Sequence, residues 1–336
     1  MMCSMPSSTR SSRRKRRNTT IVMVAAAVGA LAILVASLLL NWPTSDSDNA
    51  GSGSGTFGSA PAPDVAFEAK AGECLTWSES DASDIRKVTC AEPHLFEVTG
   101  PFDLKAEFPP QAPYPSAEHW QRLKEERCIE VTDQYLQGEF DPNGRFSIGA
   151  FTPSKENWED GDRTLHCGLQ QPGPSGKLYP VEGAAGEMDQ SNVYPAGRCL
   201  GISGSQVWDP VACSQQHAVE ISAVVNLSEE FTEGYPSEDD QDTFLATKCE
   251  ELTAGYAGGP EVAEDKGLIV FWDTMPEESW NVGSRLVNCK LGVPLPDGSG
   301  LAPVTGSVKN QVKIGKQPAG ERTTPTQPGA PATRPR

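Results

Sequence analysis

The stretches CAEPHLFEV (residues 90–98) and CSQQHAVEI (residues 213–221) decide how this sequence is interpreted. In each, a His follows the Cys by four positions and a Glu follows the His by three. The same three residues at the same spacing point to a metal site, to a catalytic pair, or to the frame of a duplicated domain. The surrounding sequence helps to weigh these three hypotheses.

The sequences around both stretches match each other. Residues 71–170 and 197–292 agree in order and spacing, from AGECL and AGRCL to GDRTLHC and GSRLVNC. Such agreement indicates an internal duplication, and two copies with a long connection indicate tandem domains rather than a solenoid. The matched pairs include Cys74/Cys199, Cys90/Cys213, His94/His217, Glu97/Glu220, Cys128/Cys249, Trp158/Trp280, Arg163/Arg285 and Cys167/Cys289.

The pattern within one copy predicts an α+β domain. ECLTW and RKVTC indicate a β-hairpin, and the β-rich run after each His indicates a third strand. Ser116 and Ser237 are N-cap candidates for a helix with one apolar face, and Gly138 and Gly255 stand where that helix is expected to stop. Two further strands follow, so each copy is expected to be a small, mostly antiparallel sheet with one covering helix.

The cysteines predict disulfides on the oxidising side of a membrane. Eight of the nine Cys follow residue 40, which is an even number. Four Cys in a copy allow three pairings, and sequence alone does not settle which one forms. The expected strand and helix positions favour neighbouring pairs, each stabilising by roughly 3–4 kcal/mol. The favoured pairs are Cys74–Cys90, Cys128–Cys167, Cys199–Cys213 and Cys249–Cys289.

The repeated His and Glu are interpreted as structural residues. Zinc sites made of Cys usually show Cys pairs two to four residues apart, which this chain lacks, and thiols oxidise outside the cell. On a strand an offset of three places side chains on opposite faces, so His94 and Glu97, like His217 and Glu220, are expected to point apart. We therefore predict no metal, no cofactor and no catalytic residue at this motif.

The N-terminal region predicts a single transmembrane helix. Residues 21–40 carry no charge, and a helix of that length at about 1.5 Å per residue spans a hydrocarbon core of roughly 30 Å. RSSRRKRRN precedes it, so residues 1–20 are expected to be a basic cytoplasmic tail. SLLLNWPTS is a poor cleavage site, which favours a retained signal-anchor over residues 21–41 above a cleaved signal peptide.

Composition predicts the remaining connections. Residues 42–70 and 171–196 are expected to be flexible linkers, and residues 293–336 a disordered Pro-rich tail. The chain has a formal net charge of −17, although residues 1–20 hold basic residues and no acidic one. An acidic body repels nucleic acid, so nucleic acid is not expected as a partner.

The GECL start, the VTCAEPHLFEV block, the YP before a Cys-bearing helix and the terminal GDRTLHC resemble the septum-formation family of actinobacterial envelope proteins. The second copy repeats them as GRCL, VACSQQHAVEI, YPS and GSRLVNC. The resemblance implies membrane anchoring and a role in cell division or the envelope, and no known chemistry. Partners are therefore expected to be the cell membrane and an envelope protein, division protein or cell-wall component.

Two hypotheses of function follow. The first is a non-enzymatic envelope protein whose two extracellular domains bind or scaffold. Its candidate contact surface is Trp158, Arg163, Trp280 and Arg285, because Trp and Arg dominate binding hot spots. Alternatively, each Trp closes the end of a sheet and each Arg pairs with a local acid. The second hypothesis is an enzyme that modifies wall polymers with acidic residues such as Glu97 and Asp160.

Overall fold

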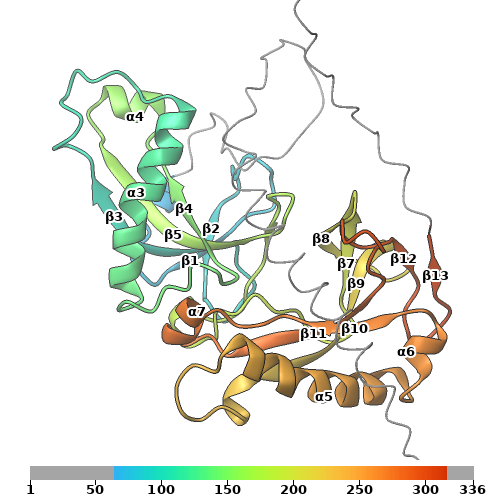
Figure 1. Ribbon diagram of the computed structural model, residues 1–336. Helices are drawn as coiled ribbons and strands as arrows, with labels where there is room; N and C mark the ends of the chain where they lie inside the picture. The colour runs from blue at the N-terminus through green and yellow to red at the C-terminus, as the bar shows by residue number, and fades with distance from the viewer. Residues whose placement is uncertain (1–63, 316–336) are drawn as a thin grey trace, which may run out of the picture.

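The computed structural model describes residues 64–315, which form two sheets that each pack against one long helix (Figure 1). We call residues 64–187 the first half and residues 188–315 the second half. The expected cytoplasmic tail, the expected transmembrane helix and most of the expected first linker lie outside the described residues. Within residues 64–315, no helix has the length and apolar character needed to cross a membrane.

The first half begins with a short helix and ends with a 3₁₀ turn. Its elements, in chain order, are α2 (Asp64–Phe67), β1 (Cys74–Thr76), β2 (Arg86–Val88), β3 (Phe96–Asp103), α3 (Ala117–Tyr135), β4 (Ser147–Phe151), α4 (Lys155–Glu159), β5 (Thr164–Pro172), β6 (Leu178–Tyr179) and η1 (Ala185–Glu187).

The second half repeats this order with longer strands. Its elements are β7 (Cys199–Ser203), β8 (Gln206–Val211), β9 (Gln216–Asn226), η2 (Leu227–Glu229), α5 (Glu238–Ala257), α6 (Val262–Asp265), β10 (Ile269–Trp272), α7 (Glu277–Asn281), β11 (Leu286–Gly292), β12 (Val304–Thr305) and β13 (Lys313–Ile314).

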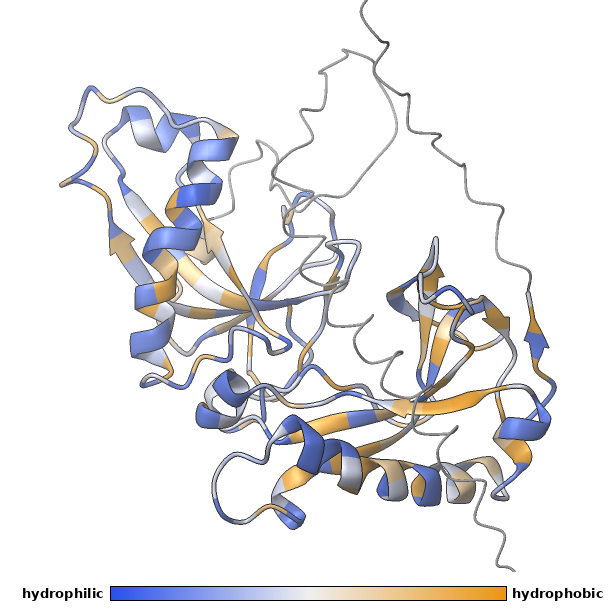
Figure 2. Cartoon of the chain, viewed as in Figure 1, coloured by the Kyte–Doolittle hydropathy of each residue, from blue (hydrophilic) through white to orange (hydrophobic). Residues whose placement is uncertain are grey.

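Both sheets are antiparallel and have corresponding strand orders. The first runs β2-β1-β3-β5-β4, with β6 added on β5. The second runs β10-β11-β9-β12-β13, with β7 also paired to β9 and β8 paired to β7. The hairpin, the third strand and the final two strands of each copy lie where the sequence predicted them. Figure 2 shows hydrophobic residues along the central strands and hydrophilic residues on the outer sides of α3 and α5.

The two long helices begin at the predicted caps. Ser116 Oγ accepts the backbone N–H of His119, and Ser237 Oγ accepts that of Asp240, so each satisfies a donor that the helix leaves unpaired. The predicted end of the second helix was wrong. Gly255 lies inside α5, and Gly258, with φ 91°, is its left-handed cap, because glycine enters that region without a Cβ clash.

The four disulfides are the four favoured pairs: Cys74–Cys90, Cys128–Cys167, Cys199–Cys213 and Cys249–Cys289. In each half one bridge closes the first hairpin and the other joins the long helix to the last strand of the predicted copy. Cys128 and Cys167 are wholly buried, as are Cys249 and Cys289. The helix-to-strand bridges therefore lie in the cores between helix and sheet.

The segments that follow each copy are ordered, contrary to expectation. After the first copy, residues 178–179 form β6 and residues 185–187 form η1, and Val181 between them forms an isolated β-bridge with His94. Of the tail predicted to be disordered, residues 304–305 and 313–314 form β12 and β13, and Val304 pairs with His217. Their backbone groups find partners in the sheet, which outweighs a Gly- and Pro-rich composition.

The connection between the halves does not uncouple them. Gln190 accepts the backbone N–H of Asp141 at 3.1 Å, and Arg145 donates to the carbonyl oxygens of Ser191 and Val193, both at 3.0 Å. On the other side, Asp189 accepts the backbone N–H of Arg285 at 2.9 Å. Residues 189–193, at the start of the second half, therefore bond to both halves.

One direct contact between the halves is centred on a buried acid. The carboxylate of Asp141, 1% exposed, accepts hydroxyls of the second half from Ser279 at 2.8 Å and Ser284 at 2.5 Å. It also accepts the backbone N–H of Asn143. A buried carboxylate is stable when such donors surround it, so this contact holds the halves in one arrangement.

Candidate functional site

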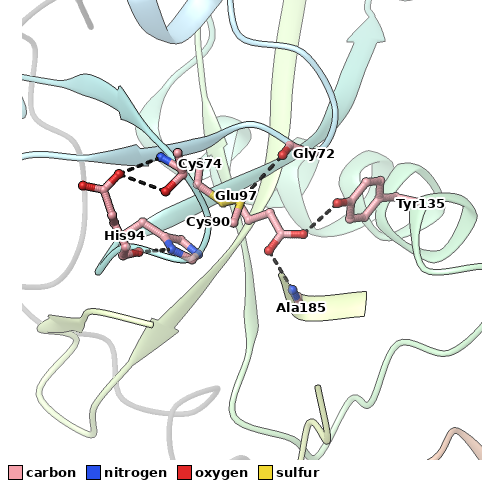
Figure 3. The surroundings of a disulfide bond; sticks show 9 residues. Gly72, Cys74, Cys90, His94, Glu97, Tyr135 and Ala185 are labelled. Atoms are coloured by element: carbon pink, nitrogen blue, oxygen red, sulfur yellow. Dashed lines mark hydrogen bonds between the residues drawn. A yellow bond between two sulfur atoms is a disulfide. The ribbon is translucent and has the colours of Figure 1, made fainter. Parts of the chain in front are cut away.

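The repeated motif of the first half forms a buried cluster around the Cys74–Cys90 bridge (Figure 3). Cys74 on β1 is the register partner of Glu97 on β3. Glu97, 2% exposed, accepts the Tyr135 hydroxyl at 2.7 Å and the Ala185 backbone N–H at 2.7 Å. The cluster thus joins strand, long helix and following segment at one carboxylate.

His94 completes the cluster from the entrance to β3. Its ring is 3% exposed, and Nδ1 donates to the carbonyl oxygen of Glu92 at 2.9 Å, because a carbonyl only accepts. One nitrogen of His94, the sulfur of Cys74 and one oxygen of Glu97 lie within 4.8 Å of one another.

The second half builds the same cluster on β7, β9 and α5. Cys199 pairs in register with Glu220, and Nδ1 of His217 donates to the carbonyl oxygen of Gln215 at 2.9 Å. Cys199, His217 and Glu220 also present ligand-type atoms within 4.8 Å of one another. Glu220 accepts one donor more than Glu97. These donors are the Tyr256 hydroxyl at 2.7 Å, the Ser307 hydroxyl at 2.6 Å and the Val308 backbone N–H at 2.7 Å.

The expectation that His and Glu point to opposite faces was wrong. In the second half the pairing with β7 passes from Val219 to His217 while β7 advances by one residue, so Ala218 is an extra residue in β9. Such a β-bulge breaks the alternation of side chains and brings His217 beside Glu220. In the first half β3 begins only at Phe96, and His94 forms an isolated bridge with Val181.

The tyrosines of the clusters have perturbed acidity. The pKa of Tyr135 is raised well above the ordinary value, first because the phenol is partly buried and then because it donates to the Glu97 carboxylate. The pKa of Tyr256 is raised for the same reasons, with Glu220 as its partner. Both phenols therefore remain protonated donors across the physiological range.

Sequence reasoning missed the segments that close the clusters, which we call the straps. Strap 1 is PVEGAA (residues 180–185) and strap 2 is PVTGSV (residues 303–308). The N–H of Gly183 donates to the Cys90 carbonyl at 2.6 Å, and that of Gly306 to the Cys213 carbonyl at 2.7 Å. Both glycines have positive φ, 100° and 96°. The sequence PV-x-G occurs in both straps, at the same number of residues after each Glu, and this repeat could have identified the straps from the sequence.

The geometry limits what the clusters can do chemically. A sulfur within a disulfide is not a thiolate, which is the form that binds metals or acts as nucleophile. The carboxylate oxygens of Glu97 and Glu220 already accept hydrogen bonds from donors within the fold. In the disulfide form, each cluster therefore ties a hairpin, a helix and a strap together.

The Trp and Arg residues proposed as a contact surface lie largely in the interior. Trp158 and Arg163 are 1% and 2% exposed, and Trp280 is 7% exposed, so an exposed patch of these side chains was a wrong expectation. The Arg163 guanidinium lies 3.8 Å from the centre of the Trp158 ring and donates to the Trp158 carbonyl. The Arg285 guanidinium likewise lies 4.0 Å from the centre of the Trp280 ring and donates to the Trp280 carbonyl. Each Arg closes its loop through backbone carbonyls and the ring, not through an acid.

Fold and clusters together define a disulfide-bonded protein of two antiparallel sheets with packed helices. A family model described as septum formation matches residues 71–289, which reach across both halves, and the chain belongs to this family.

Two curated relatives are named as uncharacterized membrane proteins of Mycobacterium tuberculosis, from strains CDC 1551 / Oshkosh and H37Rv. Each is 37% identical over 255 residues, which are 74% of this chain and 56% of the relative. The chain thus spans about half the length of the curated relatives it matches. No solved structure matches the chain.

Proposed function

We propose that this chain is a non-enzymatic, single-pass protein of the cell envelope whose two halves form an extracytoplasmic scaffold linked to septum formation. The observation that carries the proposal is the pair of disulfide clusters in which every recurrent polar residue is bonded within the fold. Such bridges persist in oxidising compartments outside the cytoplasm. The family and the naming of relatives as membrane proteins support the same placement.

The enzyme hypothesis receives less support from the geometry. Glu97, one of the two candidate acids of this hypothesis, is 2% exposed and already accepts hydrogen bonds from Tyr135 and Ala185. A general acid or base must come within hydrogen-bond reach of its substrate, which this burial prevents. We therefore propose binding to an envelope protein, a division protein or a cell-wall component, with the membrane holding residues 43–336 outside.

Imaging and topology test the proposal separately. The full chain carrying a fluorescent protein that matures outside the cytoplasm is expressed in a dividing actinobacterium, and enrichment at the septum is expected. A compartment-specific reporter fused after Arg336 is expected to be active only outside. A uniform envelope signal throughout division contradicts the septal role, and a reporter active only in the cytoplasm contradicts the topology.

A further inference from the structure

The two kinds of bridge differ in how far solvent reaches their sulfurs. All four cysteines of the helix-to-strand bridges are wholly buried. In the hairpin bridges, Cys74 and Cys199 are wholly buried, whereas Cys90 and Cys213 are half-buried in the turns that precede β3 and β9. A dissolved thiolate therefore reaches each hairpin bridge at one sulfur, and reaches the helix-to-strand bridges only when the fold opens.

Reduction of a hairpin bridge places two thiols beside the His and the Glu of its cluster. In the first half, His94, Cys74 and Glu97 already present ligand-type atoms within 4.8 Å of one another, and Cys90 is joined to Cys74. Ligands of a tetrahedral zinc ion lie about 3.3–3.8 Å apart, since its bonds measure about 2.0–2.3 Å. The cluster needs only a small closure to reach that geometry, and Cys90 stands in a turn, where it can shift.

Each His presents the ring nitrogen that a metal requires. Nδ1 of His94 donates to the Glu92 carbonyl, and Nδ1 of His217 donates to the Gln215 carbonyl. In the neutral ring, Nε2 then carries an unprotonated lone pair. Histidines that bind zinc commonly donate their other nitrogen to a carbonyl in this way, which fixes the orientation of the ring. The fold thus uses Nδ1 and leaves Nε2 for a ligand.

The carboxylates retain capacity for a metal. Oε1 of Glu97 accepts the Tyr135 hydroxyl and Oε2 accepts the Ala185 N–H. Each carboxylate oxygen has two acceptor positions, so each of these oxygens keeps one. Oε2 of Glu220 accepts the Val308 N–H and likewise keeps its second position. Donors of this kind orient the carboxylates that bind metals, so the existing hydrogen bonds and a metal are compatible.

The helix-to-strand bridges have different surroundings. They lie in clusters of apolar side chains. Within residues 64–315, the groups in which at least three His, Cys, Asp or Glu side chains come this close together are the two hairpin clusters. The more accessible sulfurs are therefore the ones that have a His and a Glu beside them, and this combination occurs in both halves.

We propose that each hairpin bridge is reducible in the folded chain and that each reduced cluster binds one zinc ion. The ligands are Cys74, Cys90, His94 and Glu97 in the first half, and Cys199, Cys213, His217 and Glu220 in the second. Two thiolates, an imidazole and a carboxylate suit a tetrahedral zinc ion. The inference goes beyond the proposed function and does not depend on it.

The reductant is a dithiol. Its thiolate attacks the half-buried sulfur of Cys90, the bond to Cys74 breaks, and Cys74 leaves as a thiolate. The second thiol of the dithiol then displaces Cys90 as a thiolate, so the dithiol gives up two electrons and becomes a disulfide. Its two protons pass to solvent, and Zn²⁺ binds both thiolates of the protein. The second half follows the same steps at Cys213 and Cys199.

The test uses the full chain with Cys3→Ser, so that every thiol comes from a bridged cysteine. A phosphine reductant is applied under native conditions and removed, and Co²⁺ is then titrated as a spectroscopic probe. Alkylation with peptide mapping should find free thiols at the hairpin cysteines and not at the helix-to-strand cysteines. The reduced chain should bind two Co²⁺ ions with the visible bands of tetrahedral, thiolate-bound cobalt, and Zn²⁺ should displace both. The oxidised chain should give no such bands.

Single substitutions separate the two sites. His94→Gln removes one ligand in the first half, so the number of tightly bound ions should fall from two to one. Loss of an outer-shell partner alone weakens metal binding about 10–100-fold, so loss of a ligand should weaken that site by at least ~100-fold. His217→Gln should act likewise, and the double variant should bind no ion tightly. The control is His119→Ala on α3, whose ring packs against Phe108, and it should still bind two.

Circular dichroism shows whether each reduced protein keeps its fold before metal binding is compared. The proposal is overturned if reduced wild type unfolds, or if the hairpin bridges resist the reductant. It is also overturned if the reduced chain binds cobalt no more tightly than the oxidised chain. Finally, it is overturned if His94→Gln and His217→Gln each still bind two ions as tightly as wild type, because the metal then lies elsewhere.

Discussion

The two halves share a frame and differ in what covers it. Each has one hairpin bridge, one helix-to-strand bridge, and a Glu that accepts a helix tyrosine and a strap N–H. Glu97 accepts two donors and Glu220 accepts three. The outer sheet face is covered by Ala66, Phe67 and Ala69 in the first half, and by Tyr194, Phe271 and Leu301 in the second. The comparison teaches that disulfides and clusters maintain the fold, which leaves the covering segments free to diverge.

Removal of the helix-to-strand bridge should have the largest effect and should be alike in both halves. The bridges close loops of 39 and 40 residues. Cys128→Ala/Cys167→Ala and Cys249→Ala/Cys289→Ala should each lower the free energy of unfolding by about 4 kcal/mol in the chain-entropy model. Chemical denaturation measures both. A loss confined to one pair would break the comparison, and Cys74→Ala/Cys90→Ala, with its shorter loop, is the matched reference.

Asp141→Ala should separate the halves. It removes a buried acceptor of Ser279 and Ser284, and hydrogen bonds to a charged group contribute about 1.5–3 kcal/mol each. Wild type is expected to unfold in one calorimetric step, and the variant in two. Two steps in wild type would show that the halves are independent after all. The control is Asp160→Ala, an exposed acid at the end of α4.

Tyr135→Phe and Tyr256→Phe should sharpen the difference between the carboxylates. Each variant removes one donor to a carboxylate, but Glu220 keeps two other donors. Tyr135→Phe should therefore lower the free energy of unfolding by about 1–2 kcal/mol, and Tyr256→Phe by less. Equal losses in urea unfolding would argue that the Ser307 bond carries no weight.

The same tyrosines set a dependence on pH. Their folded pKa values lie above that of an unfolded tyrosine, so the folded state holds protons that the unfolded state releases. Their contribution to stability is therefore complete below about pH 10 and is lost as the pH rises further. Tyrosinate absorbance should show these phenols titrating late in wild type. Each Phe variant should remove one late-titrating group.

His94→Ala and His217→Ala should have small and similar effects in the two halves. Each removes one hydrogen bond to a backbone carbonyl and leaves a small void, at a cost of about 1–2 kcal/mol. The melting temperature should fall to a similar extent in both. Neither zinc nor a chelator should shift the melting temperature of the disulfide form, in either variant or in wild type. Loss of a binding activity without any change in melting would show that the motif is a site and not a frame.

Local sequence patterns predicted the frame well because its determinants are local or repeated. Ser116 and Ser237 stand at the starts of apolar helical faces, and the cysteines lie on elements that the pattern brings together. Patterns failed where long-range contacts decide. The bulge at Ala218 depends on pairing with β7, so alternation alone placed His217 and Glu220 apart. The bond from Ala185 to Glu97 is invisible in the composition of a Gly-rich connection.

The straps have a consequence for the order in which the chain acquires its structure during synthesis. Each cluster is closed by a residue 88 positions after its Glu. A chain that emerges amino end first therefore exposes the first hairpin, α3 and β5 before Ala185 is available. The first half can complete its fold when its strap emerges. Asp189 emerges directly afterwards, before its partner Arg285 has been synthesised. A folded first half can therefore bind residues 190–193 through Asp141 and Arg145 before the second half has folded.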